Sequence, residues 1–465
     1  MVYFIKNFIK KPINLFYVVN VLRYTFWLNC KVDKKGVSYH QPLFFDDCFI
    51  MLMNIQNTAP RPKSPHPILN LGFRIFFVGS AVFAILSMLL WLAILQGFAL
   101  FKGIFNPFYW HAHEMIFGYA LAVIAGFLLT AVKTWTGQMM PFGWHLGAIF
   151  GAWATARLLW LGLHATSSSA MLIVAFVFDL LFWIMVTYSV IKAVWVARQK
   201  RQIGIVAKLA LLMLASIAFY IGVFLDNTNV QQIALYGALY LVIGVVFTIA
   251  RRVLPFFIVK GVSVDNDGKP NGLNIEQKNS ALLDRMNLIG FFGFIVFDLF
   301  IKFPTIASIF AFICVIANIC RLKNWYHPAI WQKPLLWSLV IAFGGMTASL
   351  LLFVVLPFIE TGVNVHSLGL HGLALFGVGL MTVAMMARVS LGHTGRNIHQ
   401  PPKTVSAIFI LMILSALCRV LMPMLGGDYM MWILISQVAW ILCFGLFCLS
   451  YVGILAKQRT DGLFG

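Results

Sequence analysis

The tetrad His111–Glu114 places two imidazoles and one carboxylate at the start of an apolar stretch of the chain. Two further histidines, His366 and His371, open a second apolar stretch far downstream. Neutral imidazole is a common ligand of haem iron and copper, and a nearby carboxylate can orient such a ligand through a hydrogen bond. These residue types indicate a metal or haem site, provided that the fold brings the two stretches together.

The composition places these residues in a membrane protein. Hydrophobic residues make up 61% of the 465 positions and charged residues only 10%, and the mean hydropathy is +0.90. Soluble domains carry about 25% charged residues. Within a bilayer, histidines and carboxylates are costly and usually mark a functional site.

Twelve apolar stretches are long enough to cross a membrane as helices, for which about 20 residues are needed. We therefore expect an all-α polytopic membrane protein. The twelve expected helices lie at 72–96, 111–132, 143–163, 168–192, 205–224, 232–254, 286–302, 304–322, 335–357, 366–388, 403–423 and 429–456. Unbroken apolar runs of this length exclude a transmembrane β-barrel, whose strands alternate between apolar and polar residues.

Lysine and arginine predict the orientation of these helices, because they concentrate in every second loop. The rich segments are 192–208, 251–285, 321–333, 388–403 and 457–459. The intervening loops hold little more than Lys102 and Lys302. The positive-inside rule makes the rich loops cytoplasmic, and with twelve helices both termini are then cytoplasmic. This asymmetry accounts for most of the formal charge of +20, so membrane lipids and no nucleic acid are the expected partners.

The first fifty residues differ from the rest because they mix lysine, aspartate and aromatic residues without a clear period. Residues 1–52 are expected to be a disordered or non-native extension, with Met51 or Met53 as the initiator. The other expected divisions are a short proline-rich cytoplasmic segment at 53–70, one twelve-helix domain at 71–456 and a cytoplasmic tail at 457–465.

The expected orientation brings polar groups from four helices to one depth. The tetrad and the downstream histidines lie at the outer ends of the second and tenth helices. Arg157 and Arg419 lie near the outer ends of the third and eleventh. We therefore expect one or two sites near the periplasmic surface. Asp179 and Asp298 lie inside helices and are candidates to pair with these arginines or to relay protons.

Helical geometry, at 100° per residue, refines this expectation. Gly118, Ala122 and Gly126 form a ridge of small residues suited to a close helix contact, and His111 lies on the same side. His113 points to a different side, so one ion need not take both imidazoles. The alternatives are that the histidines are ordinary interfacial residues and that the arginines pair with helix-end carbonyls.

From about Leu71 to Tyr451 the chain resembles the NnrS family of membrane proteins. Several motifs in the same order carry the resemblance: Gly72-Phe73-Arg74, Tyr109–Gly118 (YWHAHEMIFG), Ile124–Val132 (IAGFLLTAV), Trp135-Thr136-Gly137, Arg251–Phe257 (RRVLPFF), His371-Gly372-Leu373 and Met385–Arg396 (MMARVSLGHTGR). The chain departs from the family at Ile75, where proline usually follows the arginine, and this departure bears on the start of the first helix.

The resemblance implies b-type haem and copper. It also implies a role in denitrification, in the nitric oxide response and in protection from nitrosative stress, within the bacterial inner membrane. Nitric oxide is then the candidate ligand. The motifs add Arg74 and His393 to the candidate site residues, although His393 equally fits the end of a helix that a glycine caps.

The residues and the resemblance together predict a role for each candidate. The candidate metal ligands are His111, His113, His366 and His371. Glu114 is expected to orient an imidazole. Arg157 and Arg419 are expected to hold haem propionates through paired hydrogen bonds.

Three classes of function stay open. They are a haem- and copper-containing protein of the nitric oxide response, a quinol- or haem-dependent oxidoreductase that acts on nitric oxide, and a secondary transporter. Transporters often consist of repeated halves, and no corresponding motifs are visible between residues 72–254 and 286–456. The sequence decides neither which histidine binds which metal nor whether the protein is an enzyme.

Overall fold

The computed structural model describes residues 66–98, 101–102, 106–265, 267–270, 272–273, 278–358 and 362–465. All of them belong to one compact unit of the chain, Asn54–Gly465. The expectations for residues 1–52, for the initiator and for most of 53–70 lie outside the described residues.

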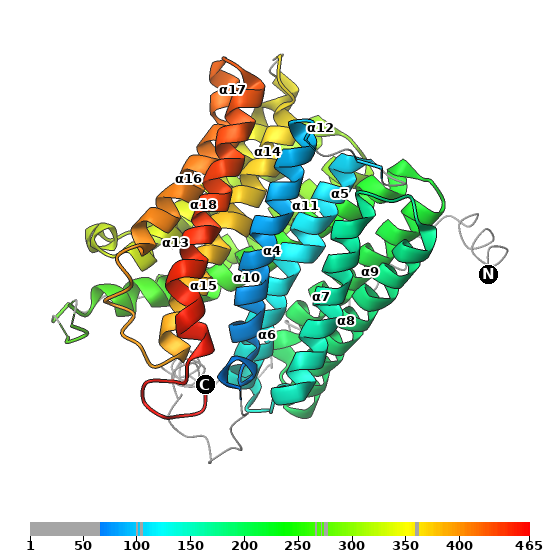
Figure 1. Ribbon diagram of the computed structural model, residues 1–465. Coiled ribbons are helices and arrows are strands. Elements are labelled where there is room, and N and C mark those ends of the chain that lie inside the picture. The colour runs from blue at the N-terminus through cyan, green and yellow to red at the C-terminus, as the bar shows by residue number, and fades with distance from the viewer. Residues whose placement is uncertain are drawn as a thin grey trace, which may run out of the picture. The chain divides into compact units, whose positions relative to one another are not determined.

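The described residues fold almost entirely into helices, which run side by side over most of their length (Figure 1). They contain no β-strand, only an isolated antiparallel bridge between Val264 and Pro270. In chain order the helices are η1 (Pro67–Leu69), α4 (Gly72–Leu95), α5 (Pro107–His113), η2 (Glu114–Ala120), α6 (Leu121–Thr136), α7 (Gly143–Leu163), α8 (Ser169–Val196), η3 (Lys200–Gln202), α9 (Ile203–Phe224), α10 (Thr228–Val262), α11 (Ala281–Ile295), η4 (Val296–Phe300), α12 (Pro304–Trp325), η5 (Pro328–Gln332), α13 (Pro334–Val355), η6 (Leu356–Phe358), α14 (Val365–Leu373), η7 (Ala374–Leu380), α15 (Met381–His393), α16 (Val405–Val420), α17 (Met422–Leu425) and α18 (Tyr429–Ala456).

Ten continuous helices in the described part of the chain are long and apolar enough to cross a membrane, which confirms the expected polytopic all-helical class. They are Gly72–Leu95, Pro107–Thr136, Gly143–Leu163, Ser169–Val196, Lys200–Phe224, Thr228–Val262, Pro304–Trp325, Pro334–Val355, Val365–His393 and Tyr429–Ala456. The two other expected spans are helical, but their helices are too short or too polar to count among these ten. At 286–302 the chain forms part of α11 and η4, which carry Asp284 and Asp298, and at 403–423 it forms α16, which has 16 residues.

Asparagine caps set the starts of the two helices that carry the candidate histidines. The side chain of Asn106 accepts a hydrogen bond from the N–H of Phe108, and proline occupies the first helical turn. The second span therefore begins at Pro107, earlier than expected, and the tetrad lies within the helix. Asn364 caps α14 in the same way. The helix α4 begins at Gly72 and is continuous at Ile75, the position where the chain departs from the family motif.

Both of these histidine-bearing spans contain a π-helical segment. The segment η2 interrupts the second span after α5, and η7 interrupts the tenth after α14. Both segments are seven residues long. Single π-helical turns within α-helices are rare and are frequent at functional sites. Nothing in the residue types of the sequence had indicated them.

Four consecutive helices occur twice with nearly the same spacing. The first copy of this four-helix unit is α4, α5–α6 with η2, α7 and α8, and the second is α13, α14–α15 with η7, α16 and α18. Residue 374, which starts η7, lies 260 positions after residue 114, which starts η2. The helices α8 and α18 each have 28 residues, and residue 429 lies 260 positions after residue 169. The motifs of the sequence had not indicated this correspondence, which is visible in the bounds of the helices.

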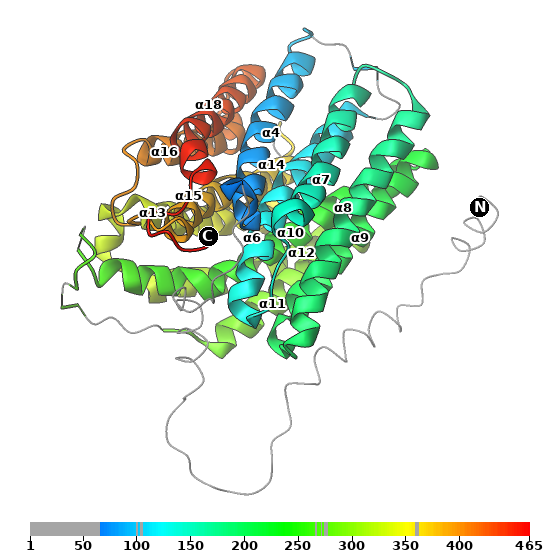
Figure 2. The same cartoon turned by 60° about the horizontal axis from the view of Figure 1, so that its bottom comes forward.

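The helix α4 of the first copy packs against the second copy as well as against its own. Figures 1 and 2 both show it beside α18 on one side and beside α6 and α7 on the other, and residue contacts agree. A Cβ atom at Gly126 would lie 2.7 Å from the Cβ atom of Phe76 in α4. A Cβ atom at Gly118 would lie 2.5 Å from the ring of Phe83. The predicted ridge of small residues thus makes the close helix contact expected of it.

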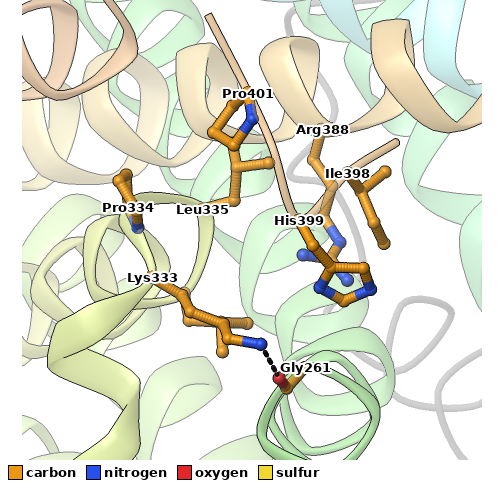
Figure 3. A pocket seen from close by; sticks show the side chains of 9 residues that line it. Gly261, Lys333, Pro334, Leu335, Arg388, Ile398, His399 and Pro401 are labelled. Carbon is orange, nitrogen blue, oxygen red and sulfur yellow. Dashed lines mark hydrogen bonds between the residues drawn. The ribbon is translucent and has the colours of Figure 1, made fainter. Parts of the chain in front are cut away.

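A small basic pocket lies where α10 ends, between that helix, the start of α13 and the chain after α15 (Figure 3). The ammonium group of Lys333 donates hydrogen bonds to the carbonyls of Gly261 (2.7 Å) and Val264 (2.6 Å). The guanidinium of Arg388 lies 4.0 Å from the ring centroid of Phe257. Burial and the nearby positive charges of Lys333 and Arg388 lower the pKa of His399 at the rim of this pocket, although Asp265 opposes that effect.

Candidate metal site and a buried ion network

The structure separates the four candidate histidines into three environments. His111 and His371 come from different copies of the four-helix unit and lie within electrostatic range of one another. His113 belongs to a buried ion network, and His366 pairs with Asp298. One site containing all four histidines is therefore not formed, as the different directions of His111 and His113 had suggested.

His371 has one nitrogen fixed and one nitrogen facing a cation. Its Nδ1 atom lies 2.8 Å from the carbonyl oxygen of Ser367, a distance at which it donates its proton. In the neutral ring the Nε2 atom then carries a lone pair, and it accepts a hydrogen bond of 3.3 Å from Nη2 of Arg419. A histidine whose Nδ1–H is held by a backbone carbonyl is oriented as metal-binding histidines usually are.

His111 lies within electrostatic range of His371 and Arg419 and is held by a tryptophan. Its ring stacks on the indole of Trp91, with ring centroids 4.6 Å apart and planes at 9°. Its Nδ1 atom is buried and has no hydrogen-bond partner among the described residues. We refer to His111 and His371 as the imidazole pair.

Arg419 lacks a carboxylate partner within the described part of the chain. Besides His371, its contacts are with Tyr429, whose ring centroid lies 5.8 Å from the guanidinium and whose side chain shares a hydrogen bond with it. Its Nη1 atom is buried without a partner among the described residues. The imidazole pair and Arg419 each keep part of their surface exposed, so the cluster is not fully enclosed by protein.

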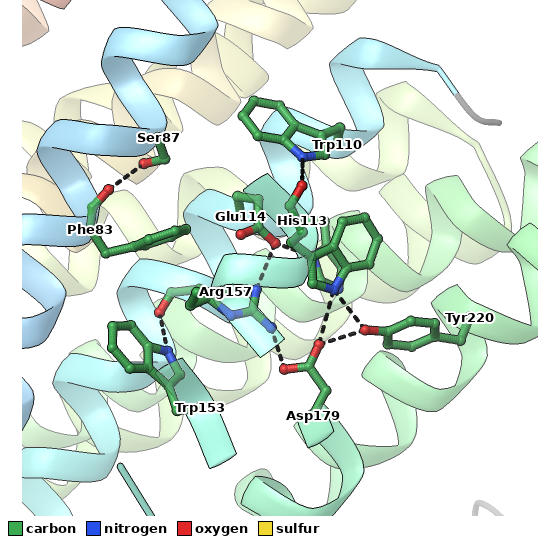
Figure 4. Close-up of polar contacts among 11 residues, drawn as sticks. Phe83, Ser87, Trp110, His113, Glu114, Trp153, Arg157, Asp179 and Tyr220 are labelled. Carbon is green, nitrogen blue, oxygen red and sulfur yellow. Dashed lines mark hydrogen bonds and ion pairs between the residues drawn. The ribbon is translucent and has the colours of Figure 1, made fainter. Parts of the chain in front are cut away.

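His113 belongs to a network of buried charged groups that joins four helices (Figure 4). Its Nδ1 atom lies 2.8 Å from Oε1 of Glu114, and the same carboxylate oxygen accepts a hydrogen bond of 2.6 Å from Arg157. Arg157 also pairs with Asp179. Tyr220 donates to Asp179 at 2.5 Å. We refer to these five residues as the ion network.

The ion network is enclosed on every side. The side chains of His113 and Glu114 have no exposed surface, and Arg157 and Asp179 are each 2% exposed. The ring of His113 stacks on Trp160 at 3.9 Å between centroids. Buried charges need partners, and here one guanidinium lies between two carboxylates. The expectation that Asp179 pairs with a buried arginine is confirmed, and Glu114 contacts His113 and Arg157.

His366 lies on another side of α14 and faces a carboxylate. Its Nε2 atom is 3.2 Å from Oδ1 of Asp298, and Tyr240 donates a hydrogen bond of 2.5 Å to Oδ2 of the same residue. The five positions between His366 and His371 correspond to about 140° of rotation, which explains why they do not converge. Asp298, expected to pair with an arginine or to relay protons, pairs with a histidine and a tyrosine.

Arg74 and His393 lie far from the imidazole pair. His393 is the last residue of α15, so 22 positions, or roughly 33 Å of helix, separate it from His371. Arg74 donates hydrogen bonds to the carbonyls of Leu455 (2.6 Å) and Lys457 (2.7 Å) at the end of α18. His393 thus lies at the end of a helix, which was the alternative to a role in the metal site. Arg74 binds the C-terminal end of another helix.

These observations describe a many-spanned helical protein whose histidine pair lies beside π-helical segments. A family model described as NnrS protein matches residues 67–459. The chain belongs to the NnrS family. The match covers the imidazole pair, the ion network and both copies of the four-helix unit of this NnrS-family protein. A comparison with curated proteins gives no significant match.

Sequence reasoning missed several residues of this NnrS-family site. Trp91, which stacks on His111, lies in an apolar run, where an indole gives no sign of its partner. Tyr220 and Tyr240 likewise lie in apolar stretches of the sequence, yet each donates a hydrogen bond to an aspartate within the helices. The basic pocket was missed because Lys333 and Arg388 were interpreted as charges that set membrane orientation.

Proposed function

We propose that this NnrS-family protein binds haem through His111 and His371 and serves in the nitric oxide response. The observation that carries the proposal is the imidazole pair itself. His371 has an unprotonated Nε2 atom, which accepts a hydrogen bond from Arg419 that a metal would replace, and His111 has a buried Nδ1 atom without a partner among the described residues. Both rings are held in place, one by Ser367 and the other by Trp91.

The two imidazoles of His111 and His371 suit haem better than a metal ion whose ligands would all come from the protein. No group of three histidine, cysteine or carboxylate side chains suited to a metal ion occurs among the described residues. A structural zinc-type site needs about four protein ligands, whereas haem brings four nitrogens of its own and would need only one or two imidazoles from the protein. Bound haem would supply an iron that could take nitric oxide as a ligand in place of one of these imidazoles. Copper, also implied by the family, is the alternative occupant of the imidazole pair.

The chain's own residues would orient and shield the group. The carbonyl of Ser367 fixes the tautomer of His371, and Trp91 covers one face of His111. Arg419 offers the free nitrogen Nη1 to a propionate, as expected from the sequence. Arg157 already has two carboxylate partners, which favours a structural role for it.

We further propose twelve membrane spans with cytoplasmic termini, in the bacterial inner membrane, and a metal site near the periplasmic face. The helices α11–η4 and α16 occupy the two positions that complete the twelve. In Figure 1, α5, α14 and α17 lie toward one end of the helices and the C-terminus toward the other. Tags at 257–285 and at 226–230 should report opposite membrane faces, and a common face would contradict this topology.

A secondary transporter is the second candidate function, because the repeated four-helix unit is a feature that many transporters share. Turnover of nitric oxide by a quinol-dependent reaction is a variant of the first proposal. Transport should appear as substrate uptake into vesicles that contain the purified protein. Turnover should appear as consumption of nitric oxide only when a reduced quinol is supplied.

The deciding experiment is an optical spectrum with metal analysis of the purified protein, recorded before and after addition of nitric oxide. The proposal predicts a Soret band, iron bound to the protein and a shift of that band with nitric oxide. Protein from haem-replete cells that contains neither iron nor copper would contradict it.

A further inference from the structure

Each copy of the four-helix unit holds an arginine among its helices, and the two copies differ in what neutralises it. In the first copy Arg157 lies between Glu114 and Asp179. The positions 260 residues later are Ala374 and Ala439, so neither carboxylate has a counterpart. An arginine is nevertheless present, because Arg419 lies two positions beyond the counterpart of Arg157. The second copy thus keeps the cation and lacks its anions.

The surroundings of Arg419 do not replace those anions. Its partners are the neutral Nε2 atom of His371 and the side chain of Tyr429. Its Nη1 atom is buried and without a partner among the described residues. A guanidinium nitrogen placed away from water without a hydrogen-bond partner is unfavourable. The comparison of the two copies therefore leaves Arg419 without an anion among the described residues.

We propose that Arg419 and the imidazole pair bind a small oxyanion with two coplanar oxygens. A guanidinium presents two parallel N–H groups, a geometry that matches such an anion. Nitrite and a carboxylate share this shape, so the anion is either free nitrite or the carboxylate of a bound cofactor. The proposal deepens the proposed function of the same site and rests on it in one respect, because nitrite is a natural ligand only where nitric oxide chemistry takes place.

The alternative for Arg419 is a simple interfacial role, in which its guanidinium contacts phospholipid phosphate or water at the membrane surface. Position 374 separates these two roles. It follows His371 by three residues, as Glu114 follows His111. A glutamate at this position supplies the missing carboxylate from within the chain and competes with any external anion. A glutamine has nearly the same size without the charge.

The experiment measures binding of sodium nitrite and sodium acetate to the purified protein in detergent, by calorimetry and by the shift in melting temperature. Wild type and Ala374→Gln should bind nitrite in a saturable manner with similar affinity. Ala374→Glu and Arg419→Gln should bind at least about tenfold more weakly, the change that corresponds to 1.4 kcal/mol. Should Ala374→Glu fail to fold, Arg419→Gln carries the test.

Haem-loaded and haem-free protein form the two arms that identify the source of the anion. Binding of nitrite to both forms indicates a free anion, and binding only to the haem-free form indicates that a cofactor carboxylate occupies Arg419. The proposal is overturned by absence of saturable binding in both arms, by equal binding to wild type and Ala374→Glu, or by inorganic phosphate binding as tightly as nitrite. Haem content, measured on the same samples, shows separately whether the proposed metal site stands.

Discussion

His111 and His371 each stand three residues before the start of a seven-residue π-helical segment, so the two imidazoles occupy corresponding positions in the two copies of the four-helix unit. The two residues nevertheless have different neighbours. His371 is held by Ser367 and contacts Arg419, whereas His111 stacks on Trp91. The repeat therefore supplies two rings at matched places on two helices, and local packing gives each ring its own role.

The ion network should respond unequally to the loss of its two carboxylates. Glu114→Gln leaves Arg157 paired with Asp179, so we expect a loss of about 1.5–3 kcal/mol, typical of a hydrogen bond to a charged group. Asp179→Asn removes the negative charge beside Arg157 and leaves one acceptor oxygen for the two donors Arg157 and Tyr220, and we expect about 3–5 kcal/mol. Unfolding in detergent, followed by tryptophan fluorescence, checks the order.

The optical spectrum of Glu114→Gln adds a second readout. Because Glu114 contacts His113 rather than the imidazole pair, its haem spectrum should match that of wild type. A shifted Soret band in this variant would restore Glu114 to the metal site expected from the sequence, and the reverse order of stabilities would contradict the account of the network.

The contact between α4 and α6 should not tolerate a methyl group at Gly126. The added Cβ atom would lie 2.7 Å from Phe76, and overpacking of this kind costs about 1–3 kcal/mol. Gly151→Ala in α7 is the matched control, since a methyl group there would have no neighbouring atom within 4 Å. We expect a lower melting temperature for Gly126→Ala and an unchanged or slightly higher one for Gly151→Ala. Equal melting temperatures for the two variants would show that this helix contact is looser than described.

The basic pocket should make stability depend on pH through His399. Burial first, and then the charges of Lys333 and Arg388, lower the pKa of His399, while Asp265 opposes them. Below the ordinary histidine pKa near 6.5 the unfolded chain therefore binds a proton that the folded protein resists. Stability is present above that pH and is lost as the pH falls toward the lower pKa of the folded state.

The measurement for this pH dependence is the melting temperature in detergent between pH 7.5 and about pH 5, a range that contains the ordinary pKa of histidine. Wild type should lose more stability over this range than His399→Asn, which cannot gain the proton. Identical slopes in the two proteins would mean that His399 does not carry the effect.

The sequence predicted the helical class and the direction of the key side chains for physical reasons that act locally. Long apolar runs must become helices in lipid, and a rotation of 100° per residue is enough to place His111 and His113 on different sides. The same reasoning separates His366 from His371. Asp179 met an arginine as expected, since a buried carboxylate needs an opposite charge.

What the sequence could not predict depends on contacts between distant segments. The π-helical segments η2 and η7 have no residue-type signature, so the correspondence of the two copies emerged only from their bounds. Helix packing in a membrane requires apolar residues of suitable size, and a repeat can therefore persist while few residues stay identical. The pairing of His111 with Trp91, and the absence of a described carboxylate at Arg419, likewise follow from the tertiary arrangement.

The most direct test of the central claim is the haem content and Soret spectrum of His111→Ala and His371→Ala, compared with His366→Ala. His366→Ala is a matched control because it removes an imidazole from the same helix as His371 but from the pair with Asp298. The account predicts that the first two variants lose haem or shift the Soret band, whereas His366→Ala keeps the wild-type spectrum. Wild-type haem content and spectra in both His111→Ala and His371→Ala would contradict it.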